Sequence, residues 1–305
     1  MLFLSDDQVR SLITADEAIS TLRDAFIVLG HGEAALQPRI RSGIDNLSLS
    51  TMGAIIPGTG VCGAKVYTTL SGQFDFVIAL FSVADGHFLG VVQGNALTEF
   101  RTAALTRVVS DLLAPEDARV LTVFGTGVQA RAHLRMLATR PSIETVFVVG
   151  LEGVSLMVDD AQREFPDLTI AGSDAESAVS KADIVVTATR STTPLFDGAA
   201  LGERAFVAAI GSSKPTSREL DDTTLARAEL VAVESLVQAK VEAGDLLLAA
   251  PGALDWSKVH EVGELLAGRR TVPTASGVTV FKSVGIGLAD VALAAHAFHK
   301  ANLAS

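Results

Sequence analysis

A glycine-containing turn between an apolar run and an amphipathic segment limits the folds open to this chain more than any other feature. Residues 119–137, RVLTVFGTGVQARAHLRML, are typical of a short buried strand, a tight turn and a helix. The turn has the spacing G-x-G-x-x-A, with Gly125, Gly127 and Ala130 at its fixed positions. The first glycine permits the turn, the second lets a phosphate approach the backbone, and the third small residue lets helix and strand pack closely. The pattern predicts a dinucleotide-binding turn.

The expected cofactor is a nicotinamide dinucleotide whose phosphates lie on the free N–H groups at the start of this helix. The next strand ends at Gly150 and Leu151, where an acidic side chain would hold the ribose and a basic one would favour a 2′-phosphate. No Lys or Arg stands there, and Glu152 follows. We therefore expect NAD(P)H, with NADH slightly favoured over NADPH. The cofactor-binding residues expected in the turn are Gly125, Thr126, Gly127, Val128, Gln129 and Ala130.

The rest of the chain changes character near residue 115. Residues 5–30 favour short helices, with Ser5 as an N-cap, and short β-branched segments up to residue 94 favour antiparallel strands. After residue 115, strand-like and helix-like segments alternate, which is typical of a parallel sheet covered by helices on both faces. We expect the C-terminal segment to form a turn and a long helix that packs back on the first half. The predicted fold is α/β: a Rossmann-type domain (115–275) and a discontinuous, mainly antiparallel α+β substrate domain (1–114 and 276–305).

Composition argues against several classes of function. A net charge of −11 disfavours nucleic-acid binding, which needs a basic face. Cys62 is the single cysteine, so neither an intrachain disulfide nor a thiolate metal cluster is expected, and no metal site is predicted. The N-terminus lacks the features of a signal peptide, and no apolar run is long enough to span a bilayer. We expect a cytoplasmic protein that binds a small molecule.

Seven segments between residues 38 and 295 carry a family resemblance. They are QPRI, GAKVY, LTEFRTAALT, GTGVQARAH, ADIVVTATRSTTPLF, AIGSSKPTSRELD and VTVFKSVGIGLADVA. In this order they resemble the ornithine cyclodeaminase/mu-crystallin family. The resemblance implies an NAD(P)-binding Rossmann domain, a substrate domain that also forms a homodimer, and substrates with an α-amino or α-imino acid group.

The resemblance also implies particular site residues. Arg39, Lys65 and Arg101 match positions around the substrate carboxylate, which a planar guanidinium can hold with two hydrogen bonds. Asp290 matches a position near the active site, where it orients a neighbour or closes the substrate pocket; an ordinary acid at a helix start is the alternative. Positions expected to line the nicotinamide and its ribose, with strand-end packing as the alternative, are Thr189, Ile210, Gly211 and Ser283.

One departure from the family pattern bears on the chemistry. Cyclodeaminases carry an acid in a G-D-x-P-G-K segment, but here residues 211–216 read GSSKPT, with Ser213 at the acidic position. A serine hydroxyl has little base strength near neutral pH, so ornithine cyclodeamination is disfavoured. Hydride transfer to a preformed imine needs mainly positioning and charge neutralisation. Lys65, Arg101 and Ser213 are the predicted catalytic residues, and Ser213 or a water that it holds is expected to hydrogen-bond the ring nitrogen.

The sequence therefore predicts an NAD(P)H-dependent reductase of cyclic ketimine acids. Its expected substrates are Δ1-pyrroline-2-carboxylate, Δ1-piperideine-2-carboxylate or both, which it would reduce to L-proline and L-pipecolate. An alanine-type dehydrogenase is the nearest alternative, because the same groups can oxidise an amino acid. An ornithine cyclodeaminase and a non-catalytic ligand binder like mu-crystallin are the others.

Overall fold

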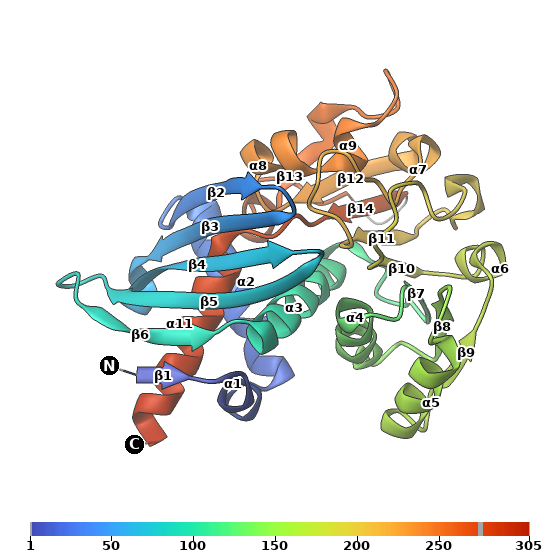
Figure 1. The fold of residues 1–305 in the computed structure, drawn as a ribbon. Helices are drawn as coiled ribbons and strands as arrows, with labels where there is room; N and C mark the ends of the chain where they lie inside the picture. The colour runs from blue at the N-terminus through green and yellow to red at the C-terminus, as the bar shows by residue number, and fades with distance from the viewer. Residues whose placement is uncertain (1, 274–276, 305) are drawn as a thin grey trace. The chain divides into compact units, whose positions relative to one another are not determined.

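The computed structural model describes residues 2–273 and 277–304, which belong to two compact units (Figure 1). The first unit takes the chain up to Leu105, residues 266–269 and the chain from Gly285 onward. The second unit takes Thr106–Leu265 and Arg270–Val284. The boundary expected after residue 114 instead falls within the second unit, and the one expected between residues 275 and 276 lies outside the described residues.

The first unit contains a six-stranded sheet in the order β1-β6-β5-β4-β3-β2. Its strands are β1 (Leu2–Leu4), β2 (Ala35–Ile44), β3 (Leu47–Ile56), β4 (Val61–Leu70), β5 (Gln73–Ser82) and β6 (Phe88–Gln93). β1 is parallel to β6, and every other neighbouring pair is antiparallel, as the segment before residue 94 predicts. The hairpin expected at residues 84–87 joins β5 to β6, where Gly86 has a φ of +75°.

Helices pack on this sheet. α1 (Asp6–Leu12) and α11 (Gly287–Ala304) contact its strands, and α2 (Ala15–His31) packs on α11. The 3-10 turn η1 (Pro57–Thr59) lies between β3 and β4, and α3 (Asn95–Leu113) begins in the first unit and ends in the second. Ser5 caps α1 as predicted, since its side chain accepts a hydrogen bond from the Gln8 N–H. α11 contacts β2, β3, β4 and β5 and also α2, so it covers one face of the sheet (Figure 1).

Two glycines bring the start of α11 close to β3. A Cβ built on Gly287 would lie 2.5 Å from the backbone nitrogen of Gly53, and one built on Gly53 would lie 2.5 Å from the carbonyl oxygen of Gly63. A side chain at Gly287 would push the helix off β3, and one at Gly53 would collide with β4. The close approach places the first turn of α11 beside β3, and its Asp290 reaches Lys65 on β4.

The second unit is built on an eight-stranded sheet in the order β13-β12-β14-β11-β10-β7-β8-β9, with all neighbouring strands parallel. Its strands are β7 (Val120–Phe124), β8 (Thr145–Val149), β9 (Thr169–Gly172), β10 (Ile184–Thr187), β11 (Phe206–Ala209), β12 (Ala228–Val233), β13 (Val259–Glu261) and β14 (Val278–Lys282). The helical segments after α3 are α4 (Val128–Ala138), α5 (Val154–Glu164), α6 (Ala175–Val179), η2 (Gly198–Ala200), α7 (Asp222–Arg227), α8 (Leu236–Glu242), α9 (Gly244–Leu247), η3 (Trp256–Lys258) and α10 (Val262–Leu266). The predicted fold class, a Rossmann-type parallel sheet with a separate mainly antiparallel sheet, is confirmed.

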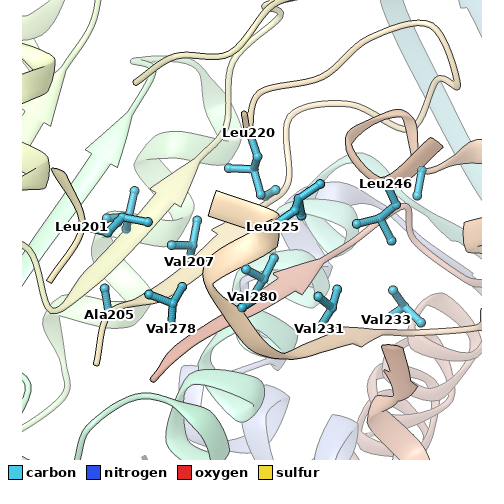
Figure 2. Packing of buried hydrophobic residues seen from close by; sticks show 14 of the residues in the cluster. Leu201, Ala205, Val207, Leu220, Leu225, Val231, Val233, Leu246, Val278 and Val280 are labelled. Atoms are coloured by element: carbon cyan, nitrogen blue, oxygen red, sulfur yellow. The ribbon is translucent and has the colours of Figure 1, made fainter. Parts of the chain in front are cut away.

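The expected assignment of residues 276–305 to the substrate domain is wrong for β14. This strand lies between β11 and β12 in the parallel sheet, and Val278 and Val280 belong to the apolar core in Figure 2. All five residues of β14 are buried, so the strand has no alternation of polar and apolar residues that would mark it in the sequence. The chain then enters the first unit at Gly285.

In the described parts of the chain, no helix combines the length and the apolar character that crossing a bilayer requires.

Candidate active site

The predicted glycine turn joins β7 to α4 in the second unit. Gly125 has a φ of +104°, and a Cβ there would lie 2.6 Å from the carbonyl oxygen of Ala188, so the turn requires glycine. Gly127 is the N-cap of α4, and a Cβ there would meet no atom within 4 Å. Ala130 is fully buried. The three positions therefore differ: the first and third are fixed by packing, whereas the second leaves open space beside the helix start.

This helix start fits a phosphate group. Among the described residues, no N-cap side chain accepts a hydrogen bond from α4, and a helix start of this kind can bind an anion through backbone N–H groups. Thr126 lies beside it and donates a hydrogen bond from its hydroxyl to the Glu152 carbonyl 2.9 Å away, which ties the turn to the loop after β8. In that loop Leu151 is fully exposed, while a Cβ on Gly150 would touch the Thr126 methyl group. The backbone at this turn therefore leaves space for the phosphates of a dinucleotide.

The ends of β10 and β11 lie beside the end of β7 and carry the residues expected near the nicotinamide. The Thr189 backbone N–H and hydroxyl both donate to Glu219 Oε1, at 2.8 and 2.7 Å. The Gly211 N–H donates to Glu219 Oε2 at 2.8 Å, and Ile210 N–H donates to the Thr187 carbonyl. One buried carboxylate thus joins two neighbouring strand ends.

The end of β14 is held by two further buried acids. Ser283 donates its hydroxyl to Glu234 Oε1 at 2.7 Å, and the Val284 N–H donates to Glu234 Oε2 at 2.9 Å. Lys282 forms a 2.8 Å ion pair with Asp245, and both side chains are inaccessible to solvent. Burial alone would raise the pKa of Asp245, but the Lys282 charge and hydrogen bonds from two backbone N–H groups lower it overall. The carboxyl edge of the sheet is therefore fixed by side-chain contacts.

Ser213 follows β11 in the same unit and is partly buried. The neighbouring Ser212 carbonyl accepts a 2.7 Å hydrogen bond from Lys282, so the loop that carries Ser213 is anchored to β14.

The first unit brings together the residues expected to hold a carboxylate. We call Arg39, Lys65 and Arg101, with Asp290, the cationic cradle. Lys65 on β4 forms a 2.9 Å ion pair with Asp290 on α11 and donates a 2.8 Å hydrogen bond to Thr98 on α3. The Arg101 Nε lies 3.3 Å from the same Asp290 oxygen. Three elements that are distant in sequence therefore converge on one carboxylate.

Burial makes the Lys65 ammonium unusual. Its side chain is 1% exposed, and its nitrogen lies 4.0 Å from the centre of the Phe76 ring. Loss of solvation, opposed by Asp290 and reinforced by the charges of Arg101 and Arg39, lowers the pKa of Lys65 to about 7. Lys65 can therefore exchange a proton near neutral pH, as a general acid or base requires.

Gly285 closes the cradle between the two arginines. Arg39 donates a 2.8 Å hydrogen bond to the Gly285 carbonyl. A Cβ on Gly285 would lie 3.1 Å from Arg101 Nη1 and 3.4 Å from Arg39 Nη2, and its φ is +77°. Among the residues that the structure describes, the Arg101 Nε and Asp290 Oδ2 are buried and have no hydrogen-bond partner. Three cations against one carboxylate, with buried polar atoms unsatisfied, is an arrangement suited to a bound anion.

Sequence reasoning missed several contacts. Thr98, Phe76 and Gly285 contact the cradle, and Glu219, Glu234, Asp245 and Lys282 fix the strand ends. The segments SRELD and VTVFKSVGIG belong to the family motifs, and the charged residues within them are the sequence signal that could have indicated Glu219 and Lys282. In the described residues, no group of three or more His, Cys, Asp or Glu side chains is arranged to hold a metal ion.

Comparison with known proteins places these features in context. Residues 1–304 match the model of the ornithine cyclodeaminase/mu-crystallin family. Δ1-pyrroline-2-carboxylate reductase from Bacillus cereus (strain ZK / E33L) is 30% identical over 294 residues, covering 94% of this chain and 88% of that protein.

Several solved structures are also similar to this chain. A probable ornithine cyclodeaminase from Bordetella pertussis Tohama I is 44% identical, with a TM-score of 0.97 and coverage of 100% of this chain and 98% of that one. Thermococcus litoralis Δ1-pyrroline-2-carboxylate reductase, in complex with NADH and L-proline, is 26% identical with a TM-score of 0.94 and the same coverage. An archaeal alanine dehydrogenase dimer with bound NAD is 26% identical with a TM-score of 0.93, covering 100% and 97% of the two chains. The glycine turn, the cationic cradle and these likenesses show that the chain belongs to the ornithine cyclodeaminase/mu-crystallin family.

Proposed function

We propose that this protein is an NAD(P)H-dependent oxidoreductase that acts on C=N bonds and reduces cyclic ketimine acids. The proposed substrates are Δ1-pyrroline-2-carboxylate, Δ1-piperideine-2-carboxylate or both, with L-proline and L-pipecolate as products. The Bacillus cereus relative bears the name of the first activity, and the Thermococcus litoralis structure contains NADH and L-proline.

The observation that carries the proposal is the cationic cradle. Arg101 and Arg39 both present guanidinium nitrogens close to Gly285, and a planar carboxylate matches such a donor set. Lys65 adds a charge that can be gained or lost near neutral pH. A small acid with a reducible nitrogen-containing group can use both properties.

In the proposed reaction the arginines hold the substrate carboxylate and fix the orientation of the imine carbon. The bound nicotinamide supplies hydride to that carbon when it is reduced. The ring nitrogen gains a proton as the C=N bond becomes a C–N single bond, and Lys65 Nζ is the proposed donor. Ser213 is proposed to hydrogen-bond the ring nitrogen. Hydride transfer also requires substrate and nicotinamide to meet in the working complex, where orientation supplies much of the acceleration.

NADH is the proposed cofactor in preference to NADPH. Its phosphates would bind at the start of α4, and its ribose beside Gly150 and Leu151. Residues 150–153 carry no Lys or Arg to pair with a 2′-phosphate, and Glu152 would repel it.

Alanine-type dehydrogenation is the second candidate, because an archaeal alanine dehydrogenase shares the fold over the full chain. Cyclodeamination is a third candidate, because the Bordetella pertussis structure is described as a probable ornithine cyclodeaminase. Ser213, however, provides no carboxylate for the amine. A substrate panel separates the three. The purified protein is mixed with NADH or NADPH and each cyclic imine, then with pyruvate and ammonia, and ornithine is supplied with NAD⁺. The proposal expects loss of reduced-nicotinamide absorbance with a cyclic imine. Loss of absorbance only with pyruvate and ammonia would assign the dehydrogenase instead. Formation of proline from ornithine would assign the cyclodeaminase.

The first unit also favours a homodimer. The sheet face opposite α11 exposes several large apolar side chains, an arrangement that monomeric proteins rarely leave in water. Members that are 41–72% exposed include Ile40, Ile44, Leu47, Leu49, Ile55 and Phe3. We propose that two copies pair through this face, as the dimeric state of the archaeal alanine dehydrogenase suggests. A cytoplasmic location is proposed from the single cysteine and the need for reduced nicotinamide.

A further inference from the structure

We infer that Glu219 positions the two strand ends on which the nicotinamide is proposed to bind, and that its negative charge favours the oxidised, positively charged ring over the reduced one. The inference rests on the proposed function for the identity of the cofactor. It adds a positioning residue and an electrostatic preference that neither the motif spacing nor the cradle requires.

Glu219 accepts hydrogen bonds at both carboxylate oxygens from neighbouring strand ends. Oε1 accepts from the N–H and hydroxyl of Thr189, and Oε2 accepts from the Thr187 hydroxyl at 2.9 Å and the Gly211 N–H at 2.8 Å. Each carboxylate oxygen thus faces one backbone N–H and one hydroxyl, and the ionised form can accept all four hydrogen bonds. The side chain is 0% exposed, which removes these bonds from competition with water.

The backbone is shaped around this carboxylate. A Cβ on Gly211 would collide with Glu219 Oε1 and with the Thr189 carbonyl oxygen, so a larger residue at 211 would displace the carboxylate or the strand end. The Glu219 backbone is also fixed, since its N–H donates a 2.6 Å hydrogen bond to Asp245. The position of the carboxylate at the strand ends is therefore determined from both sides.

No cation neutralises Glu219 directly. Within residues 2–273 and 277–304 no Lys, Arg or His forms an ion pair with it, and the nearby buried Lys282 pairs with Asp245 instead. The two linked buried acids Glu219 and Asp245 therefore share one buried lysine, Lys282, which pairs with Asp245. At a given distance, charge interactions are stronger in such a buried environment than in water.

This excess of negative charge affects the oxidised and the reduced nicotinamide differently. A nicotinamide ring that has lost hydride carries a formal positive charge, whereas the reduced ring is neutral. A carboxylate fixed behind the strand ends where the ring is proposed to bind would stabilise the charged form and the partial charge that develops as hydride leaves. The carboxylate therefore favours transfer of hydride from the reduced nicotinamide to the imine.

The experiment measures dissociation constants for NAD⁺ and NADH, without substrate, in the unaltered protein and in Glu219→Gln. The ratio of the two constants isolates the charge effect, because a general loosening of the strand ends weakens both forms alike. We expect Glu219→Gln to weaken NAD⁺ relative to NADH by about tenfold. Thr187→Val is the matched control, since it removes one hydrogen bond to the same carboxylate and keeps the charge; its ratio should stay within about twofold of the unaltered protein.

A second measurement does not depend on the folding of a variant. The unaltered protein should bind NAD⁺ at least as tightly as NADH, and a preference for NADH of more than about tenfold would overturn the inference. An unchanged ratio in Glu219→Gln, or an equal change in Thr187→Val, would overturn it as well. Absence of any nicotinamide binding by the unaltered protein would instead refute the proposed function.

Discussion

Lys65 and Asp290, which are 225 positions apart in the sequence, form a 2.9 Å ion pair from which solvent is almost fully excluded. Desolvation lowers the pKa of Lys65, and the Asp290 charge and hydrogen bond raise it, with a net value of about 7. Replacement of a partner in a buried pair has large effects because the remaining group stays buried.

The Asp290→Asn variant tests this pair through its pH profile. If protonated Lys65 is the active form for imine reduction, kcat/KM of the unaltered enzyme is highest below pH 7 and falls as pH rises through about 7. Loss of the Asp290 charge removes an influence that raises the pKa of Lys65, so the falling limb should move to lower pH. The profile is measured with a cyclic imine and saturating NADH.

Lys65→Met serves as the reference for that profile. It removes the titrating group, so its residual activity should lack the limb near pH 7. A limb that stays at the same pH in both variants would assign it to another group and contradict the role of Lys65.

Arg101→Met should impair recognition of the substrate and leave cofactor binding intact. A charge-assisted pair with a carboxylate is lost, so KM for the cyclic imine should rise by about a hundredfold. The NADH dissociation constant should change less than about twofold. Arg101→Lys keeps the charge but not the planar donor set, and we expect an intermediate KM. Equal KM values for the unaltered enzyme and Arg101→Met would exclude the cradle as the carboxylate site.

The two glycines of the turn should respond differently to alanine. Gly125→Ala places a Cβ 2.6 Å from the Ala188 carbonyl at a φ of +104°, and should lower the free energy of unfolding by about 1–3 kcal/mol. The Cβ of Gly127→Ala meets no atom within 4 Å, so the free energy of unfolding should stay within about 0.5 kcal/mol of the unaltered protein. This variant should nevertheless bind NADH at least about tenfold more weakly. Denaturant unfolding and fluorescence titration measure the two effects. Unchanged NADH binding by Gly127→Ala would place the phosphates elsewhere.

The sequence predicted those parts of the fold that depend on local pattern. The G-x-G-x-x-A spacing located β7, its turn and α4, and the alternation of segments predicted the parallel sheet. β14 was misassigned because a fully buried five-residue strand has no amphipathic period, and its place between β11 and β12 depends on pairing between distant segments.

The candidate site shows the same division. Family resemblance identified Arg39, Lys65, Arg101 and Asp290 as a group, but nothing in their spacing indicates that Lys65 and Arg101 share one oxygen of Asp290. The lowered pKa of Lys65 comes from burial, which arises when α11 packs on β3 through Gly287 and Gly53. Such effects depend on tertiary packing and cannot be read from a motif.

The exposed face of the first unit's sheet gives the last prediction. Leu49 is 49% exposed on β3, on the side opposite α11, and lies among the other apolar side chains of that face. If two copies pair there, Leu49→Asp buries a charge in the interface and should shift the protein toward monomers, because an unpaired buried charge costs several kcal/mol. Light scattering across a concentration series measures the change. Val241→Asp, at a 65% exposed position on α8 in the second unit, is the matched control and should leave the molar mass of the assembly unchanged. An unaltered protein that is monomeric at all concentrations, or a Leu49→Asp variant that stays dimeric, would show that the apolar face does not hold the two copies together.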